Sequence, residues 1–231
     1  RESSGGTDIR YQQFSEDEYE TKLLEALAAG RGPDIFAVKN SWTPRYLDKI
    51  VPVPVEQFSL RDLESEFVDV VKMDLVAGDR IYGLPFYVDT LALVYNRDIF
   101  NTESVAQPPQ NWDDFALVSQ KLTKKEGIFG SLKGAGAALG RADNVADFKD
   151  IISLLMMQGG EKMYDPQFKE ASFDKKGGAA ALDFYTSFAK AGNVNQSWDA
   201  SQPRSLEAFA RGQAAMILAY ASELPFIKAQ S

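Results

Sequence analysis

The 231-residue chain contains no cysteine and no histidine. Without cysteine it has no thiol nucleophile and no disulfide, and without histidine it has no Ser-His-Asp triad and none of the usual zinc sites. An enzyme built from this chain would have to rely on carboxylates, Lys, Tyr or Ser. Cysteine-free proteins occur in the periplasm and in the cytosol, so this absence does not assign a compartment.

Long apolar runs and clustered positive charge are also missing. No apolar stretch approaches the length that spans a bilayer. The formal net charge is −8, and the lysines and arginines are scattered, so we expect no nucleic-acid partner. No Asp-x-Asp-x-Asp-Gly calcium loop occurs. The sequence therefore predicts no metal site and gives no indication of a cofactor.

What the chain does contain is the pattern of a globular α/β protein. Hydrophobic residues make up 45% of it, which is ordinary for a folded domain. Apolar spacing and capping residues predict helices over 16–29, 112–122, 145–158, 175–191 and 206–211. Short apolar runs predict strands over 34–38, 128–139 and 214–219. A strand followed by a loop and a helix is the order that a parallel α/β layer requires.

The glycine-rich stretch 134–140 has two interpretations. Glycine-rich loops can cradle phosphates at the start of a helix. This stretch lacks the Gly-Lys-Ser/Thr ending of such loops and the G-x-G-x-x-G spacing of dinucleotide sites. A strand packed closely against its neighbours is therefore the favoured interpretation.

The most informative segment is Gly83–Asn96. Two extended apolar pieces, Ile81–Tyr87 and Leu91–Tyr95, meet at the polar pair Asp89-Thr90, and a helix is expected to begin after Asn96. This pattern predicts a strand that crosses from one lobe to another, with a carboxylate at the crossing.

Four short motifs follow one another along the chain. They are Gly32-Pro33-Asp34-Ile35-Phe36, the crossing segment Tyr82–Asn96, the helix start Pro108–Phe115, and Ala208–Met216, which reads AF-x-x-G-x-x-AM. In this order and spacing they resemble the extracellular solute-binding proteins of ABC importers, in the sugar-type (maltose-binding-like) branch. The family often places a ligand-stacking Trp after the last motif, and this chain has Tyr220-Ala221-Ser222 there instead.

The resemblance implies a two-lobed α/β fold of the periplasmic-binding-protein type (type II). Lobe one would comprise residues 1–89, lobe two residues 90–231, and the hinge would lie at about 88–91. Both ends would be incomplete, because the family's opening strand and helix would precede Asp8 and its return crossing would follow Ser231.

The same resemblance implies that the protein is not an enzyme. It would capture a solute, most simply a sugar or oligosaccharide, in a cleft between the lobes and deliver it to an ABC permease. Its location would be periplasmic or otherwise extracytoplasmic, and a lipid anchor on the full-length protein stays open.

Three candidate ligand residues lie in the first half of the chain. A sugar site needs aromatic planes together with carboxylates and amides that accept and donate hydrogen bonds. Asp89 lies where the family places an acid facing the cleft, and its alternative is a turn residue that bonds its own backbone. Trp42 and Asn40 follow an expected strand end, where α/β ligand sites form, with lobe packing and loop capping as their alternatives.

Three further candidates complete the predicted site. Tyr87 could face the cleft beside Asp89 or be an ordinary core aromatic. Asn144 could line lobe two or cap the helix that follows it. Tyr220 could replace the missing Trp as a stacking platform.

Other functions remain open on the sequence alone. The same fold could bind a peptide, a polyamine or another small polar solute, and a polyamine site would hold several acids. A carboxylate-based α/β hydrolase would show two carboxylates facing each other across a cleft, one with a raised pKa. The chain could also be a structural piece with no activity of its own.

Overall fold

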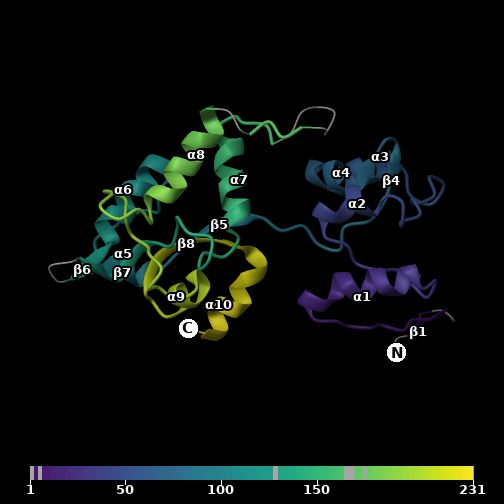
Figure 1. Cartoon of the computed structure of the whole chain (residues 1–231), viewed down its shortest axis with the longest axis horizontal. Helices are drawn as coiled ribbons and strands as arrows, with labels where there is room; N and C mark the ends of the chain where they lie inside the picture. The colour runs from purple at the N-terminus through teal and green to yellow at the C-terminus, as the bar shows by residue number, and fades with distance from the viewer. Residues whose placement is uncertain (1–2, 5–6, 127–129, 164–169, 174–175, 231) are drawn as a thin grey trace. The chain divides into compact units, whose positions relative to one another are not determined.

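The computed structural model describes residues 3–4, 7–126, 130–163, 170–173 and 176–230. Positions 128, 129 and 175 of the expected elements therefore lie outside the described residues. The chain divides into two compact units, Arg1–Val88 (unit 1) and Asp89–Ser231 (unit 2), which are described separately (Figure 1). The assignment of these units to hinged lobes stays a prediction.

Unit 2 is built on a four-stranded mixed sheet in the order β5-β8-β7-β6. β7 runs parallel to β8, whereas β5 runs antiparallel to β8 and β6 antiparallel to β7. Leu91 at the start of β5 pairs with Tyr220 at the end of β8, so these two strand ends share one edge of the sheet. The strands are β5 (Leu91–Tyr95), β6 (Lys124–Glu126), β7 (Ser131–Ala137) and β8 (Ala214–Tyr220).

Helices cover both faces of this sheet. In the view of Figure 1, α7 and α8 lie above it and α9 and α10 lie below it. This layering is the α/β architecture that the sequence predicts. The helices are α5 (Arg97–Thr102), α6 (Trp112–Leu122), α7 (Phe148–Gln158), α8 (Lys176–Ser187), α9 (Ser205–Ala210), the 3-10 helix η2 (Ala221–Glu223) and α10 (Leu224–Gln230).

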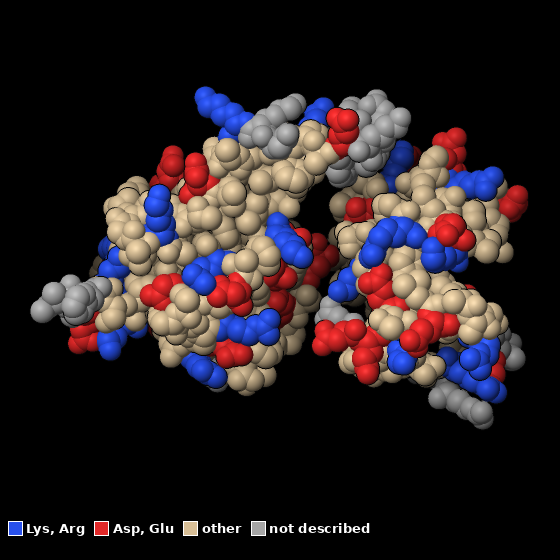
Figure 2. Space-filling model, viewed as in Figure 1, with Lys and Arg blue, Asp and Glu red and all other residues tan. Residues whose placement is uncertain are grey.

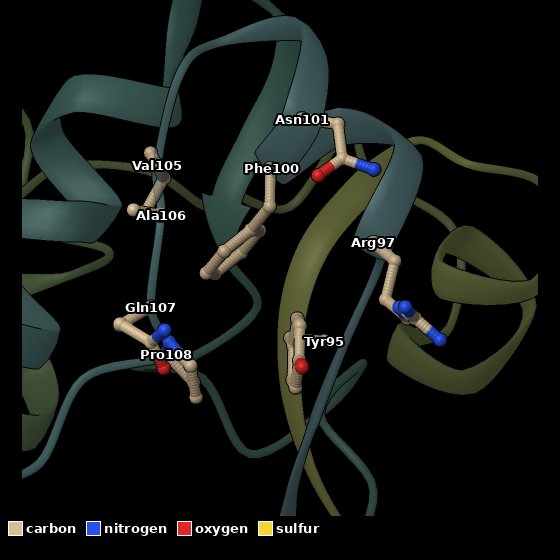
Figure 3. A pocket seen from close by; sticks show the side chains of 8 residues that line it. All are labelled: Tyr95, Arg97, Phe100, Asn101, Val105, Ala106, Gln107 and Pro108. Atoms are coloured by element: carbon tan, nitrogen blue, oxygen red, sulfur yellow. The ribbon is translucent and has the colours of Figure 1, made fainter.

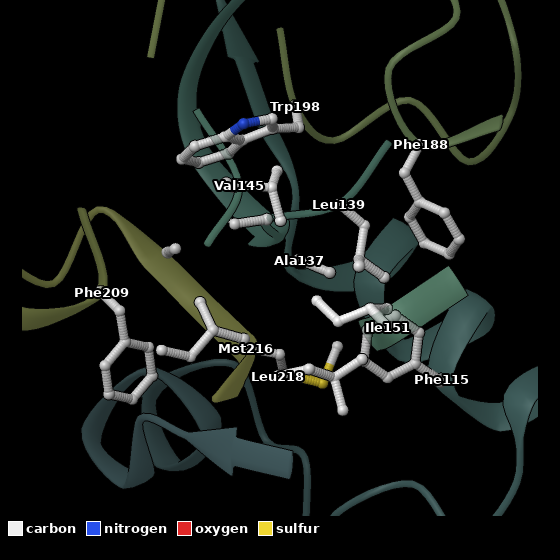
Figure 4. Packing of buried hydrophobic residues seen from close by; sticks show 14 of the residues in the cluster. Phe115, Ala137, Leu139, Val145, Ile151, Phe188, Trp198, Phe209, Met216 and Leu218 are labelled. Atoms are coloured by element: carbon white, nitrogen blue, oxygen red, sulfur yellow. The ribbon is translucent and has the colours of Figure 1, made fainter. Parts of the chain in front are cut away.

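The core of unit 2 lies between the sheet and these helices (Figure 4). Trp198, Phe188, Leu139 and Met216 are fully buried. Burying one large apolar side chain stabilises a fold by roughly 1.5–3 kcal/mol. The strand β8 is buried along almost its whole length, which explains its unbroken apolar sequence.

The glycine-rich stretch forms most of β7 and does not form a phosphate loop. A Cβ atom on Gly136 would lie 1.9 Å from the backbone oxygen of Ser119 in α6. The Gly136 N–H donates instead to Thr123 Oγ1 at 3.1 Å. Glycine therefore allows α6 to approach the strand closely, and the strand prediction is confirmed for the described residues.

Unit 1 is made of short elements around two small apolar clusters. One cluster contains Leu63, Val71, Leu75 and Ile81, and the other contains Leu23, Trp42 and Tyr46. Its strands pair only two residues at a time. The elements are β1 (Ser3–Ser4), β2 (Thr7–Asp8), α1 (Glu16–Ala28), η1 (Asn40–Trp42), α2 (Thr43–Tyr46), α3 (Leu60–Glu66), α4 (Asp69–Leu75), β3 (Val76–Ala77) and β4 (Arg80–Ile81).

Two strand predictions in unit 1 are wrong. Residues 34–38 form no strand, and Ile35 is 91% exposed. Of the expected strand over Ile81–Tyr87, only Ile81 lies in a strand, β4. A strand needs a neighbour that satisfies its backbone groups, and no described strand of this unit pairs with residues 34–38 or with residues 83–87, whereas Ile81 pairs with Val76 of β3. The predicted strand Leu91–Tyr95 is confirmed as β5.

Several element boundaries follow directly from capping residues. Asn111 Oδ1 accepts a hydrogen bond from the Asp114 N–H at 2.8 Å and starts α6 where the sequence predicts it. Gly212, with φ +69°, ends the segment that contains α9. The helix expected from Val145 begins later, at Phe148, because Asp147 has a left-handed backbone with φ 52° that cannot continue a helix.

Candidate functional site

The candidate site lies where β8 ends and turns into η2. The Tyr220 N–H donates to Glu223 Oε2 at 2.9 Å, which caps η2 from within its own turn. The Asp89 carboxylate caps the same turn from outside, with the Ala221 N–H 3.0 Å from Oδ1 and the Ser222 N–H 3.1 Å from Oδ2. The antiparallel pairing of β5 with β8 therefore brings two residues 132 positions apart into contact.

These donors hold Asp89 in its ionised form. Asp89 also accepts from the Thr90 N–H at 2.8 Å, as the turn alternative for this residue predicts. The Ser222 side chain and the three backbone N–H groups lower the pKa of the Asp89 carboxyl below its ordinary value. Asp89 is thus an anchor between the start of unit 2 and the end of β8.

A pair of carboxyls, Glu223 and Asp147, lies beside this anchor. Burial raises the pKa of Glu223 to about 7, and the charges of Asp147 and Asp89 add to the effect. Burial also raises the pKa of Asp147, and the neighbouring Glu223 offsets part of this rise. Asp147 Oδ2 is shielded from solvent and accepts no N–H or hydroxyl hydrogen bond from the described residues.

Tyr220 completes the group. Its hydroxyl is half-buried, and Asp150 of α7 is among the groups that act on it. Burial and the negative charges of Asp150, Asp147 and Asp89 raise the pKa of Tyr220 to about 12, so the phenol stays neutral. We call Asp89, Asp147, Asp150, Tyr220 and Glu223 the turn cluster.

The turn cluster offers one aromatic ring and several oxygen acceptors on a single unit. No group of three or more His, Cys, Asp or Glu among the described residues could hold a metal ion. Figure 2 shows acidic and basic side chains interspersed over the visible face of each unit. Among the helices that the structure describes, none is both long and apolar enough to cross a membrane.

Trp42 and Asn40 have structural partners within unit 1. The Trp42 ring is buried between Tyr19 and Tyr46, at centroid distances of 6.1 Å and 5.6 Å and interplanar angles of 16° and 15°. Asn40 Nδ2 donates to Asp74 Oδ2 at 2.9 Å. The ring contacts of Trp42 correspond to its packing alternative, and the hydrogen bond of Asn40 corresponds to its loop alternative. A ligand role for either residue stays a prediction.

Tyr87 and Asn144 differ in how freely they could meet a ligand. Tyr87 is 74% exposed and packs edge-on against Phe86, so it is not a core residue. The Asn144 amide is held by the fold, because Nδ2 donates both protons to the backbone oxygens of Asp199 and Gln202 and Oδ1 accepts from the Trp198 indole. It fixes a loop and does not cap α7, so the capping alternative is wrong; its ligand role stays a prediction.

Three acids of the turn cluster were not predicted from the sequence: Asp147, Asp150 and Glu223. The spacing Tyr220-x-x-Glu223 matches the position of the acid in a capping box, although a tyrosine is not the usual first residue. Asp147 and Asp150 are three residues apart at the start of α7, where acids are common for helix-dipole reasons. Their meeting with Glu223 depends on tertiary contacts that spacing alone does not show.

A separate pocket of about 200 Å³ lies at the opposite end of β5 (Figure 3). The rings of Tyr95 and Phe100 form its floor, with their centroids 4.8 Å apart. Arg97, Asn101, Val105, Ala106, Gln107 and Pro108 line the rest of it. No acidic residue lines this pocket, so it is distinct from the turn cluster.

Comparison with known proteins gives the family. The family model "Bacterial extracellular solute-binding protein" matches residues 2–230. The chain is 28% identical over 102 residues to the maltotriose-binding protein of Pyrococcus abyssi. The aligned residues make up 44% of this chain and 21% of that relative. It is 24% identical over 198 residues to the diacetylchitobiose binding protein DasA of Streptomyces coelicolor. This alignment covers 83% of this chain and 43% of that relative.

Solved structures agree in fold. A solute-binding protein from Thermotoga lettingae, bound with α-D-tagatose, superposes with a TM-score of 0.72 at 24% identity and covers 93% of this chain and 55% of that one. The sugar-binding protein MalE from Xanthomonas citri gives a TM-score of 0.72 at 21% identity, with 95% and 54% coverage. These likenesses confirm the predicted α/β fold of the periplasmic-binding-protein type.

The chain matches only part of the length of each of these proteins. The chain spans about half the length of these structures and less than half the length of the two relatives. The family model, by contrast, covers nearly every residue of the chain. The chain belongs to the bacterial extracellular solute-binding protein family, as its four motifs predict.

Proposed function

We propose that this chain captures a saccharide for ABC-type import. The observation that carries the proposal is the similarity to relatives named for maltotriose and diacetylchitobiose, one of which matches 83% of this chain. The partners would be the saccharide and the transmembrane subunits of an ABC permease. The location would be outside the cytoplasmic membrane, in keeping with a family described as extracellular.

The turn cluster supplies chemistry that suits a saccharide. Tyr220 offers an aromatic face for sugar C–H groups, and carboxylates accept hydrogen bonds from hydroxyls. Three backbone N–H groups already occupy Asp89, so a ligand hydroxyl would share an oxygen that also caps η2. Ligand contact at Asp89 would then also act on the turn at the end of β8.

A small cationic or zwitterionic solute is the second candidate. The turn cluster gathers four acids, and no lysine or arginine is among the groups that shift the pKa values of Glu223 and Asp147. UgpB from Mycobacterium tuberculosis, solved with glycerophosphocholine, shares the fold with a TM-score of 0.71 at 18% identity. The fold therefore also accommodates a solute that carries a quaternary amine.

We also propose that the chain is not a hydrolase. In most glycoside hydrolases the two working carboxyls stand about 5–9.5 Å apart, which leaves room for the substrate or a water. Glu223 and Asp147 lie on one unit and shift each other's pKa, so they do not face each other across a cleft between the units. A raised pKa in such a pair reflects shared burial and does not indicate a separated acid and base.

Calorimetric titration of the chain tests these candidates. The ligands are maltotriose, diacetylchitobiose, spermidine and a short peptide, each with the melting temperature measured in parallel. Heat release and a raised melting temperature with either saccharide would support the first proposal. A response to spermidine alone would favour the second, and a response to the peptide alone would reject both.

A further inference from the structure

The four-stranded sheet of unit 2 has two edges, and one of them is protected against pairing with another chain. This protected edge is β6, which consists only of the charged and exposed residues Lys124–Glu126. Its pairing with β7 is irregular between Lys124 and Lys125. Short length, lysines and an irregular register are features by which natural proteins keep an edge strand unpaired.

The opposite edge, β5, has none of these features. β5 pairs with β8 in an unbroken register over all five of its residues, Leu91–Tyr95. It contains no charged residue, no proline and no glycine. Its neighbour β8 is buried along almost its whole length, whereas every residue of β5 is partly or fully exposed, Ala92 most of all. β5 is therefore a regular, apolar edge strand that no other described strand covers.

The hydrogen bonding of the next residue shows which backbone groups of β5 point away from β8. The Asn96 N–H donates to the Ala215 oxygen at 2.8 Å and so faces β8. Because successive residues of an antiparallel strand face opposite sides, the odd-numbered residues Leu91, Leu93 and Tyr95 direct their N–H and C=O groups to the open edge. Among the described residues, no backbone hydrogen bond satisfies these groups of Leu93 or Tyr95.

We propose that the open edge of β5 pairs with the β5 edge of a second copy of this chain, antiparallel about a two-fold axis at Leu93. In this register Leu91 lies opposite Tyr95 of the second copy and Leu93 opposite its own counterpart. Every outward N–H and C=O group of the two strands then has a partner. Ala92 lies opposite Val94 of the second copy, so all the cross-strand side-chain pairs are apolar. A two-fold contact of this kind is closed and gives a dimer.

The charges that flank β5 fit the same register. Just beyond the paired residues, the two-fold axis brings Asp89 of each copy toward the exposed Arg97 of the other. A register shifted in either direction would leave outward backbone groups unpaired and would move these opposite charges apart. The contact between two five-residue strands is small compared with the roughly 1,200 Å² or more that a stable interface buries. The dimer is therefore weak and forms only at high protein concentration.

Sedimentation velocity of the ligand-free chain, from about 10 to 500 μM, tests the association. We expect the average mass to rise with concentration from 25.6 kDa toward twice that value. Ala92→Lys gives the open edge the residue type that protects β6 and should weaken the association by at least about tenfold. Ala180→Lys makes the same change at an exposed position of α8 and should leave it unaltered. Equal melting temperatures of the two variants would show that both are folded.

A single introduced cysteine tests the register, because the chain contains no cysteine of its own. Residues in a hydrogen-bonded antiparallel pair have Cα atoms about 5.5 Å apart, which suits a disulfide. Leu93→Cys should therefore crosslink into a dimer on mild oxidation, much faster than Leu117→Cys at a 62% exposed position of α6. Crosslinking at equal rates would overturn the register. A mass of 25.6 kDa at every concentration, or a dimer that Ala92→Lys leaves intact, would overturn the proposal itself.

Discussion

Gly136 and Gly134 lie two residues apart in β7 but face different surroundings. A Cβ on Gly136 would collide with the Ser119 backbone oxygen, whereas a Cβ on Gly134 would meet only the Lys124 side chain at 3.8 Å. We expect Gly136→Ala to destabilise the chain by about 3 kcal/mol or more, because backbone must move to admit the methyl group. Gly134→Ala is the control and should change stability by less than about 1 kcal/mol. Urea unfolding curves measure both, and equal costs would contradict the close approach of α6.

Asp89 has a structural role as a cap and a proposed role in ligand binding, and substitution can separate the two. Asp89→Ala removes the acceptor of three backbone N–H groups, so we expect lost ligand binding and also a loss of about 1–2 kcal/mol of stability. Asp89→Asn keeps one oxygen acceptor and should retain most of the stability. Calorimetric titration and thermal melts on both variants measure the two effects. Unaltered saccharide affinity in Asp89→Ala would remove this residue from the site.

The candidate site could be predicted from sequence only in part, for physical reasons visible at single residues. Asp89 and Tyr220 were predicted because a family motif marks each position. The neighbouring acids were not, because Glu223 and Asp147 are 76 positions apart and meet only through the fold. Asn144 was predicted for its place before a helix, yet tertiary contacts engage both its amide nitrogen and its amide oxygen.

At the scale of elements, Asn144 connects the entrance of α7 to the loop that carries Trp198. Asn144→Ala would leave the buried Trp198 indole N–H and two loop carbonyls without their partner. We expect a loss of about 2–3 kcal/mol, since an unpaired buried polar group costs its full desolvation. Asn101→Ala, at an exposed asparagine of α5, should cost less than about 0.5 kcal/mol. Guanidinium unfolding of the two variants measures the difference, and equal midpoints would rule out this role.

The junction of η2 with α7 makes stability depend on pH. The ordinary pKa of Glu223 is 4.5 and its folded value is about 7, so the folded chain retains a proton that the unfolded chain has released. This contribution is fully present below pH 4.5 and is lost as pH rises through 7. Because the pair is partly exposed, we expect the free energy of unfolding to fall by only roughly 1 kcal/mol between pH 5 and 8.

Thermal melts across this range provide the measurement. The lowered pKa of Asp89 affects stability only at acid pH. Its contribution is fully present above the ordinary pKa of 3.8 and is lost as the pH falls through the lower folded value, so it is constant between pH 5 and 8. Glu223→Gln should flatten the profile, and Glu207→Gln, a substitution at an exposed i,i+4 pair with Arg211, should not. A melting temperature that rises from pH 5 to 8 in the native chain would show that the sign is wrong.

At the scale of the whole molecule, the two units differ in how well local sequence predicts them. In unit 2, caps such as Asn111 and the buried strand β8 agree with the fold that tertiary packing produces. In unit 1, the apolar run over residues 34–38 has the composition of a strand, but no described strand pairs with it. Apolar composition specifies that a segment can pair, and the presence of a neighbour decides whether it does.

The segment Gly83–Val88 should be the first place where a protease separates the units. Among the described residues, no backbone hydrogen bond holds it, and Phe86 and Tyr87 are 97% and 74% exposed. A protease needs an extended, unpaired segment, so dilute chymotrypsin should cut after Phe86 or Tyr87. The masses of the two complementary fragments should place the cut at one of these residues. The double substitution Phe86→Ser, Tyr87→Ser should slow this cut without changing the melting temperature, because neither ring belongs to a buried cluster. Survival of this bond while the interior of unit 2 is digested would mean that Gly83–Val88 is protected by contacts that the structure does not show.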